Sequence, residues 1–209
     1  MKSSRSSRGY GSEGRTRRLA MGALLALALP GLTAGAIHIT PTVVIEKQAD
    51  VIRSTLPGAT QYFVKTVQIG KQDLKRIEEE ADFEPESPEV KFFYGEDGSG
   101  NAVGVVLFPQ VNTQHGPFEI GLTVGPDGRV RRVRLTKATV ETKPWVKQAA
   151  SQEFLADFEG LTAGEPATRA LARLQAAGLG AMPTWAGKQV ALAVQQGLEL
   201  HRILYAGGD

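Results

Sequence analysis

The chain has 209 residues, a formal net charge of +2 and no cysteine. The lack of cysteine excludes disulfides, thiolate-bound metals, iron–sulfur clusters and cysteine nucleophiles. The three histidines are not spaced as zinc ligands, and the sequence contains no P-loop, Gly-x-Ser-x-Gly or Gly-x-Gly-x-x-Gly motif. No zinc site, hydrolase centre or nucleotide-turnover centre is therefore indicated.

Residues 1–36 have the pattern of a secretory signal peptide. Six Lys and Arg residues precede an apolar run from Leu19 to Leu29, and Ala34-Gly35-Ala36 fits a small-x-small cleavage site. Thr16-Arg17-Arg18 also resembles the twin-arginine export signal. The alternative is an uncleaved anchor, because the 21 residues from Leu19 to Ile39 are enough to span a bilayer. We expect an exported protein, either periplasmic or anchored to the outer face of the inner membrane.

Removal of the leader reverses the sign of the net charge. Residues 37–209 carry 18 basic and 21 acidic side chains, a formal net charge of −3. The basic character of the whole chain belongs to the leader, so the sequence does not favour a nucleic-acid partner. The remaining 173 residues suit a single domain with its own core.

The first half of residues 37–209 predicts two helices and three strands. Thr40-Pro41 is typical of a helix start, and Leu56-Pro57-Gly58 ends that helix. The following elements are a strand over Tyr62–Ile69, a charged helix over Gly70–Ala81, an acidic loop over Asp82–Pro88, and strands over Val90–Tyr94 and Ala102–Phe108.

The second half predicts a hairpin followed by helices. Phe118, Ile120, Leu122 and Val124 alternate along one strand, and Gly125-Pro126-Asp127-Gly128 is a strong turn signal before the next. Helices are then expected over Pro144–Phe158, Glu165–Ala177 and Pro183 to about Tyr205. The predicted class is α+β, a mostly antiparallel sheet of about five strands with helices packed against it.

This order of parts resembles the FMN-binding domain of exported and membrane redox proteins. The resemblance runs from about Ile37 to Leu204. It is carried by four segments: Ile37-His38-Ile39-Thr40 with Leu56-Pro57-Gly58-Ala59-Thr60, the hairpin from Gln114 to Leu135, the Glu141-Thr142 pair, and Phe154-Leu155-Ala156-Asp157-Phe158-Glu159-Gly160. Similar proteins include the C subunit of the sodium-pumping NADH:quinone reductase and the G subunit of Rnf complexes. The resemblance implies an FMN-binding-domain-like fold and electron transfer.

The chain departs from this family at the flavin attachment motif. In the family, the FMN phosphate is esterified to the threonine of Ser-Gly-Ala-Thr, just before the last helix. The matching residues here are Leu179-Gly180-Ala181-Met182. A thioether cannot form a phosphoester, so covalent flavin is not expected. Lys143-Pro144 is a second departure, because relatives often have a glycine there.

The resemblance still implies a noncovalent FMN site. The start of the last helix would hold the phosphate, and an indole would stack on the ring. The predicted cofactor-binding residues are His115, Glu141, Thr142, Gly180, Ala181, Thr184 and Trp185. Trp145, beside Glu141-Thr142, is a further stacking candidate. The alternative for both tryptophans is simple packing, with Leu179 and Met182 filling a lost flavin pocket.

The expected function is that of an exported, membrane-associated electron-transfer protein rather than a stand-alone enzyme. Its partners would be a membrane redox complex or a small electron carrier. The alternative is a cofactor-free structural or assembly subunit of a membrane electron-transfer complex. Two charged stretches, the basic strand Arg129–Lys137 and the acidic run Glu78–Glu89, are interpreted as solvated faces. Their alternatives are docking to an acidic partner or lipid headgroups, and steering of a basic redox partner such as a small cytochrome.

Overall fold

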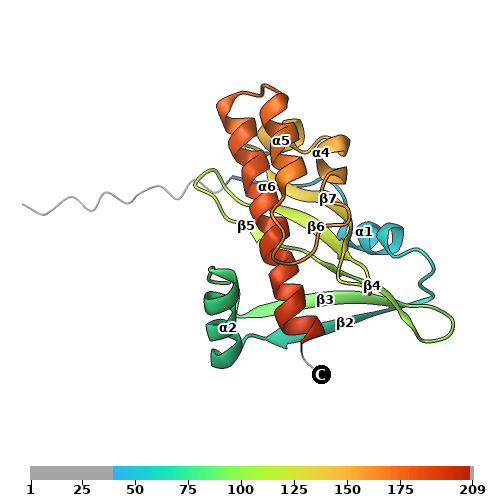
Figure 1. Cartoon of the computed structure of the whole chain (residues 1–209). Coiled ribbons are helices and arrows are strands. Elements are labelled where there is room, and N and C mark those ends of the chain that lie inside the picture. The colour runs from blue at the N-terminus through green and yellow to red at the C-terminus, as the bar shows by residue number, and fades with distance from the viewer. Residues whose placement is uncertain (1–39, 208–209) are drawn as a thin grey trace, which may run out of the picture. The chain divides into compact units, whose positions relative to one another are not determined.

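The computed structural model describes residues 40–207, which form an α+β domain with a mostly antiparallel sheet (Figure 1). This confirms the predicted fold class. The predicted leader and the segment Ile37-His38-Ile39 lie outside the described residues. Within the described part, no helix combines the length and apolar character needed to cross a bilayer.

The sheet has seven strands in place of the predicted five or so. They are β1 (Thr42–Val44), β2 (Gln61–Gln68), β3 (Glu89–Glu96), β4 (Ala102–Leu107), β5 (Gln110–Val111), β6 (Phe118–Val124) and β7 (Val130–Thr139). All pairs are antiparallel, in the order β1-β7-β6-β4-β3-β2, and β5 pairs with β6 beyond the end of β4.

The predicted helix start at Thr40-Pro41 is wrong, because the chain first forms β1. Thr42 pairs with Thr139 and Val44 with Lys137 at one edge of the sheet. Three β-branched residues in succession suit a strand, and pairing with β7 overrides the local Thr-Pro signal. The first helix, α1, spans only Gln48–Thr55.

Helices cover both faces of β6. A side chain at Gly197 of α6 (Ala181–Leu200) would meet Leu122, whereas one at Gly121 would meet Val51 of α1. Adjacent strand residues point to opposite faces, so α1 and α6 lie on opposite sides of the sheet. Figure 1 shows α6 as the long helix across the sheet. All of β6 is therefore buried, not only its predicted apolar face.

The prediction of one continuous helix over Pro144–Phe158 is also wrong. It consists of α3 (Lys143–Ala149) and α4 (Gln152–Ala156), and Ser151 caps α4 by accepting a hydrogen bond from the Phe154 N–H at 3.2 Å. The remaining helices are α2 (Lys71–Ala81), α5 (Thr168–Ala176) and α6, which continues as a π-helical turn, η1 (His201–Ala206).

Candidate functional site

Three segments far apart in sequence meet at the open end of the β6–β7 hairpin. His115 precedes β6, Glu141 follows β7, Trp145 lies in α3 and Trp185 in the first turns of α6. His115 Nδ1 lies 2.7 Å from Glu141 Oε1. The imidazole centroid is 5.0 Å from the Trp145 ring and 6.3 Å from the Trp185 ring. We name these four residues the His115 cluster.

The fold brings the cluster together through strand register and helix packing. The Phe118–Ala138 pair places the loop before β6 beside the turn after β7. Helix α3 starts directly after that turn and packs on α6, where a side chain at Gly187 would approach Ala149 to 3.3 Å. Both indoles meet His115 edge to face, with interplanar angles of 85° and 78°, a favourable aromatic geometry.

Hydrogen bonds fix the orientation of the His115 ring. Gln114 Nε2 lies 3.1 Å from His115 Nε2, and Glu141 Oε1 lies 2.7 Å from Nδ1. The imidazole is therefore held from both of its nitrogens by polar side chains. Both His115 and Glu141 remain partly exposed.

Thr142, a predicted cofactor-binding residue, is fully buried and bonded within the protein. Its hydroxyl oxygen accepts from the Thr139 N–H at 3.0 Å, and its O–H donates to Thr139 Oγ1 at 2.8 Å. Thr139 Oγ1 in turn donates to the His115 carbonyl at 3.1 Å. Thr142 therefore stabilises the loop that carries His115, and its hydroxyl is engaged in hydrogen bonds within the protein.

The start of α6 offers backbone donors but no charged side chain. Gly180 is the N-cap, followed by Ala181 and Met182. Pro183 has no N–H, and the Thr184 N–H already bonds Gly180 O at 3.0 Å. The Thr184 hydroxyl donates to Leu179 O at 3.2 Å. The amides of Ala181 and Met182 remain as the donors of this terminus, with the positive end of the helix dipole.

The basic strand Arg129–Lys137 is largely engaged in ion pairs. Arg131 contacts Asp127 at 2.8 Å, and Lys137 contacts Glu119 at 2.9 Å. These pairs occupy charges that docking to an acidic partner or to lipid would need, so they favour the solvated-face interpretation.

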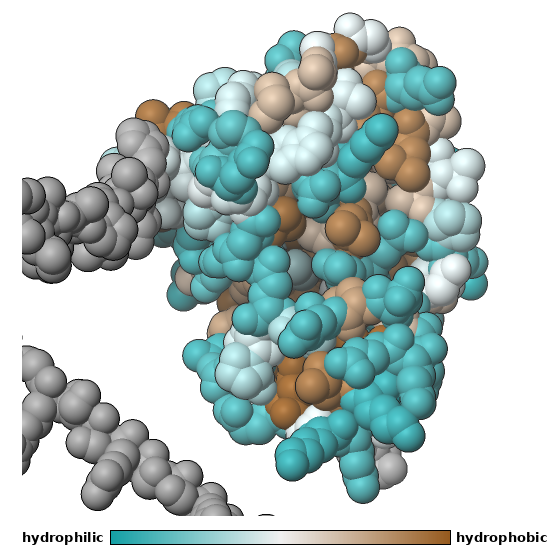
Figure 2. Space-filling model, turned by 90° about the vertical axis from the view of Figure 1, so that its left-hand side faces the viewer, coloured by the Kyte–Doolittle hydropathy of each residue, from teal (hydrophilic) through white to brown (hydrophobic). Residues whose placement is uncertain are grey.

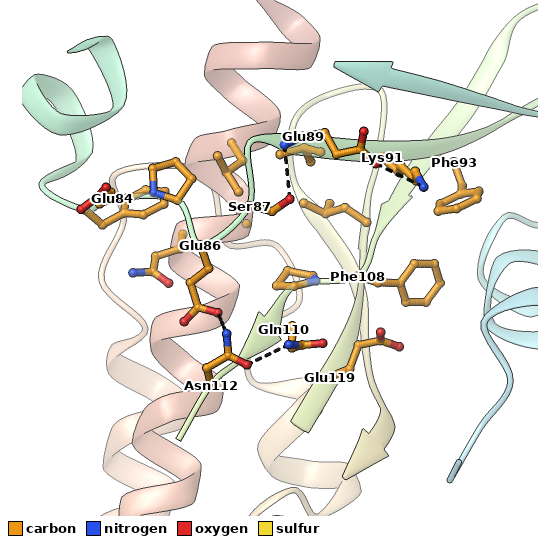
Figure 3. Close-up of a pocket in the computed structure, with 18 of the residues that line it drawn as sticks. Glu84, Glu86, Ser87, Glu89, Lys91, Phe93, Phe108, Gln110, Asn112 and Glu119 are labelled. Atoms are coloured by element: carbon orange, nitrogen blue, oxygen red, sulfur yellow. Dashed lines mark hydrogen bonds and ion pairs between the residues drawn. The ribbon is translucent and has the colours of Figure 1, made fainter. Parts of the chain in front are cut away.

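A substantial groove lies elsewhere on the molecule. Its volume is about 510 Å³, and residues 83–87, β3, residues 107–112 and α6 line it (Figure 3). None of the predicted site residues contributes to this lining. Three acidic residues of the groove, Glu84, Glu86 and Glu89, belong to the run that the sequence predicts as a solvated helix end and loop. Among residues 40–207, no three His, Asp or Glu side chains gather in a way that would hold a metal ion.

Replacing Gly116 by alanine should lower the free energy of unfolding by about 2 kcal/mol. Gly116 has φ of +93°, and an added Cβ would lie 2.5 Å from Thr139 Cγ2. Gly100→Ala is the matched control, because φ there is +82° with nothing within 4 Å of the added atom. Urea unfolding should show a clearly larger loss for Gly116→Ala, part of which Thr139→Ser restores. Equal losses at both glycines would contradict the contact.

Comparison with known proteins does not identify a family for this chain. The chain matches no protein-family model, and no curated protein matches it. The resemblance to FMN-binding domains therefore rests on the sequence segments alone.

Proposed function

We propose that this domain binds FMN noncovalently at the His115 cluster and transfers electrons between membrane redox partners. One observation carries the proposal: His115, Glu141 and Trp185 come from three separate segments and lie together beside the start of α6. Bound FMN would supply the redox chemistry, whereas the protein binds and orients it. The resemblance to exported redox proteins supports the same function.

The residues present suit a noncovalent flavin and not a covalent one. Trp145 and Trp185 are partly exposed, so part of each indole is accessible for stacking on a flat ring. The amides of Ala181 and Met182 would hold the phosphate at the positive end of α6. Met182 stands where a phosphoester would need a hydroxyl.

The test is the spectrum of the full chain isolated from its native membrane or periplasm. We expect flavin absorbance that is lost on denaturation and filtration, because the cofactor is not covalent. A denaturing gel should accordingly show no flavin fluorescence in the protein band. A colourless protein that does not respond to added FMN would overturn the proposal.

Trp185→Leu should weaken FMN binding about fivefold, because stacking on an aromatic ring contributes roughly 1 kcal/mol beyond burial. Titration of the protein into FMN, followed by quenching of flavin fluorescence, measures the change. Tyr62→Leu is the control, since Tyr62 is an exposed aromatic on β2, which pairs with β3 at the other edge of the sheet. A similar weakening in both variants would exclude a specific role for Trp185.

A cofactor-free structural or assembly subunit is the second candidate function. The observation that favours it is that the polar groups of the predicted site are occupied from within: Glu141 and Gln114 bond His115, Thr139 bonds Thr142, and Leu179 bonds Thr184. Co-purification from native membranes decides this case. Flavin-free protein that migrates with a membrane complex supports it, and flavin-free protein that migrates alone contradicts it.

A further inference from the structure

The groove of about 510 Å³ opens where the sheet splits between β3 and β5; we name it the β3–β5 groove. Figure 3 shows Glu89, Lys91 and Phe93 on one side of it and Phe108 and Gln110 on the other. Residues 83–87 border its mouth, and residues 196, 197 and 200 of α6 also line it, as does Gln48 of α1. The groove shares no residue with the His115 cluster, so binding in the groove does not depend on bound flavin.

The groove exists because one rung of the sheet is missing. The β3–β4 ladder joins Gly95 to Gly104 and Phe93 to Val106. The next hydrogen-bonded rung in this register would join Lys91 to Phe108. It is absent among the described residues, because the chain bends toward β6 at Pro109, whose carbonyl accepts from Ile120 N–H at 3.1 Å.

The missing rung leaves backbone groups of β3 facing the groove. Ile69 N–H donates to Pro88 O at 2.8 Å in the same register that pairs β2 with β3. Val90 and Phe92 therefore direct their N–H and C=O groups toward β2, since hydrogen-bonding direction alternates along a strand. Lys91, between them, directs its N–H and C=O into the groove. The groove thus contains an open strand edge.

The charge of the groove is acidic. Glu84, Glu86, Glu89 and Glu119 line it, against the single base Lys91. Gln68 and then Lys91 bond the Glu89 carboxylate and lower its pKa, so Glu89 is ionised at neutral pH. Glu119 is neutralised by Lys137 at 2.9 Å. Glu84 and Glu86 stand exposed at the mouth, as a continuation of the acidic run from Glu78.

Apolar side chains lie between these charges. Phe83, Phe93, Leu107, Phe108 and Leu200 contribute to the lining. Figure 2 shows the face that carries α2, where small hydrophobic areas are enclosed by hydrophilic side chains. An open backbone edge, apolar contacts and an acidic border together suit an extended chain with alternating basic and apolar side chains.

We propose that the β3–β5 groove binds an extended basic segment of a partner protein by strand addition. The segment's backbone pairs with Lys91 on the open edge of β3, and its Lys or Arg side chains lie beside Glu84 and Glu86. The open edge runs from Glu89 to Lys91, because Phe93 already pairs with Val106. It extends roughly 7 Å, which matches a segment of about three residues. The charge complementarity selects a basic partner and opposes nucleic acids.

The test uses two fluorescein-labelled hexapeptides, one alternating Lys with Val and the other alternating Glu with Val. Fluorescence anisotropy with the full chain should show binding of the basic peptide that weakens as salt is raised, and no binding of the acidic peptide. Glu84→Gln/Glu86→Gln should weaken the affinity about tenfold. Glu78→Gln/Glu79→Gln removes the same charge from α2 outside the groove and should change the affinity by less than about twofold.

Amide exchange provides the readout that separates strand addition from loose charge attraction. On binding of the basic peptide, the Lys91 amide should exchange more slowly, whereas the amides of α2 should not change. Failure of the basic peptide to bind would overturn the proposal. So would binding that leaves Lys91 unprotected, or equal weakening by the two double variants.

Discussion

Phe158→Ala is expected to lower the free energy of unfolding by about 4 kcal/mol. Phe158 has no exposed surface, and its ring meets Phe154 edge to face at 5.2 Å and 89°. Truncation removes buried apolar area, leaves a cavity and breaks this aromatic pair. Urea unfolding followed by circular dichroism measures the loss.

Two further variants separate these contributions. Phe158→Leu keeps most of the volume and loses only the aromatic pair and shape fit, so it should cost about 1 kcal/mol. Phe63→Ala removes a ring that is 39% exposed on β2 and should also cost about 1 kcal/mol. If Phe63→Ala costs as much as Phe158→Ala, Phe158 is not part of the core that the structure shows.

Phe158 also illustrates what the sequence can and cannot predict. Its spacing from Phe154 correctly predicted a shared buried face. The continuous helix was wrong because Ala150 turns the chain out of helical geometry, with ψ of 55°, and Ser151 starts a new helix. Apolar spacing reports burial, whereas the break depends on a cap and on how the two short helices pack.

The two missed strands have a common cause. β1 has three residues and β5 has two, which is too short for an alternating pattern to be visible. Their strand conformation comes from pairing with β7 and β6, distant in the chain. The β3–β5 groove was not predicted for the same reason. The bend at Pro109 leaves a strand pair unformed, and which pair this is depends on the alignment of β3 with β4 in the folded sheet.

The candidate site was predictable in part. The resemblance predicted His115, Glu141 and Trp185 as members of one site, and the structure places them together. The resemblance does not distinguish a hydroxyl that faces a ligand from one that is hydrogen-bonded within the protein. Thr142 is of the second kind, since its partner Thr139 lies only three residues away and the turn after β7 closes between them.

Acidification should destabilise the protein through His201, by about 3 kcal/mol between pH 6.5 and pH 4. His201 is 6% exposed, and its ring stacks on Tyr205 at 5.2 Å. Burial lowers the pKa of His201 from 6.5 to about 4, because the folded protein disfavours the charged imidazolium. The unfolded chain binds the proton below pH 6.5, but the folded protein does not until about pH 4. Stability is therefore complete above pH 6.5 and falls as the pH drops through this window.

His201→Phe isolates this effect, because phenylalanine keeps the stacking on Tyr205 and cannot be protonated. Carboxylates that titrate in the same range affect both proteins, so the difference between the two unfolding free energies reports His201 alone. Urea unfolding at pH 7 and at pH 4 should show wild type losing about 3 kcal/mol more than the variant. If the two proteins lose stability in parallel, His201 is accessible to protonation in the folded state. The packing of η1 against β3, where the Tyr205 ring lies 5.2 Å from the Phe92 ring, must then be looser than the structure shows.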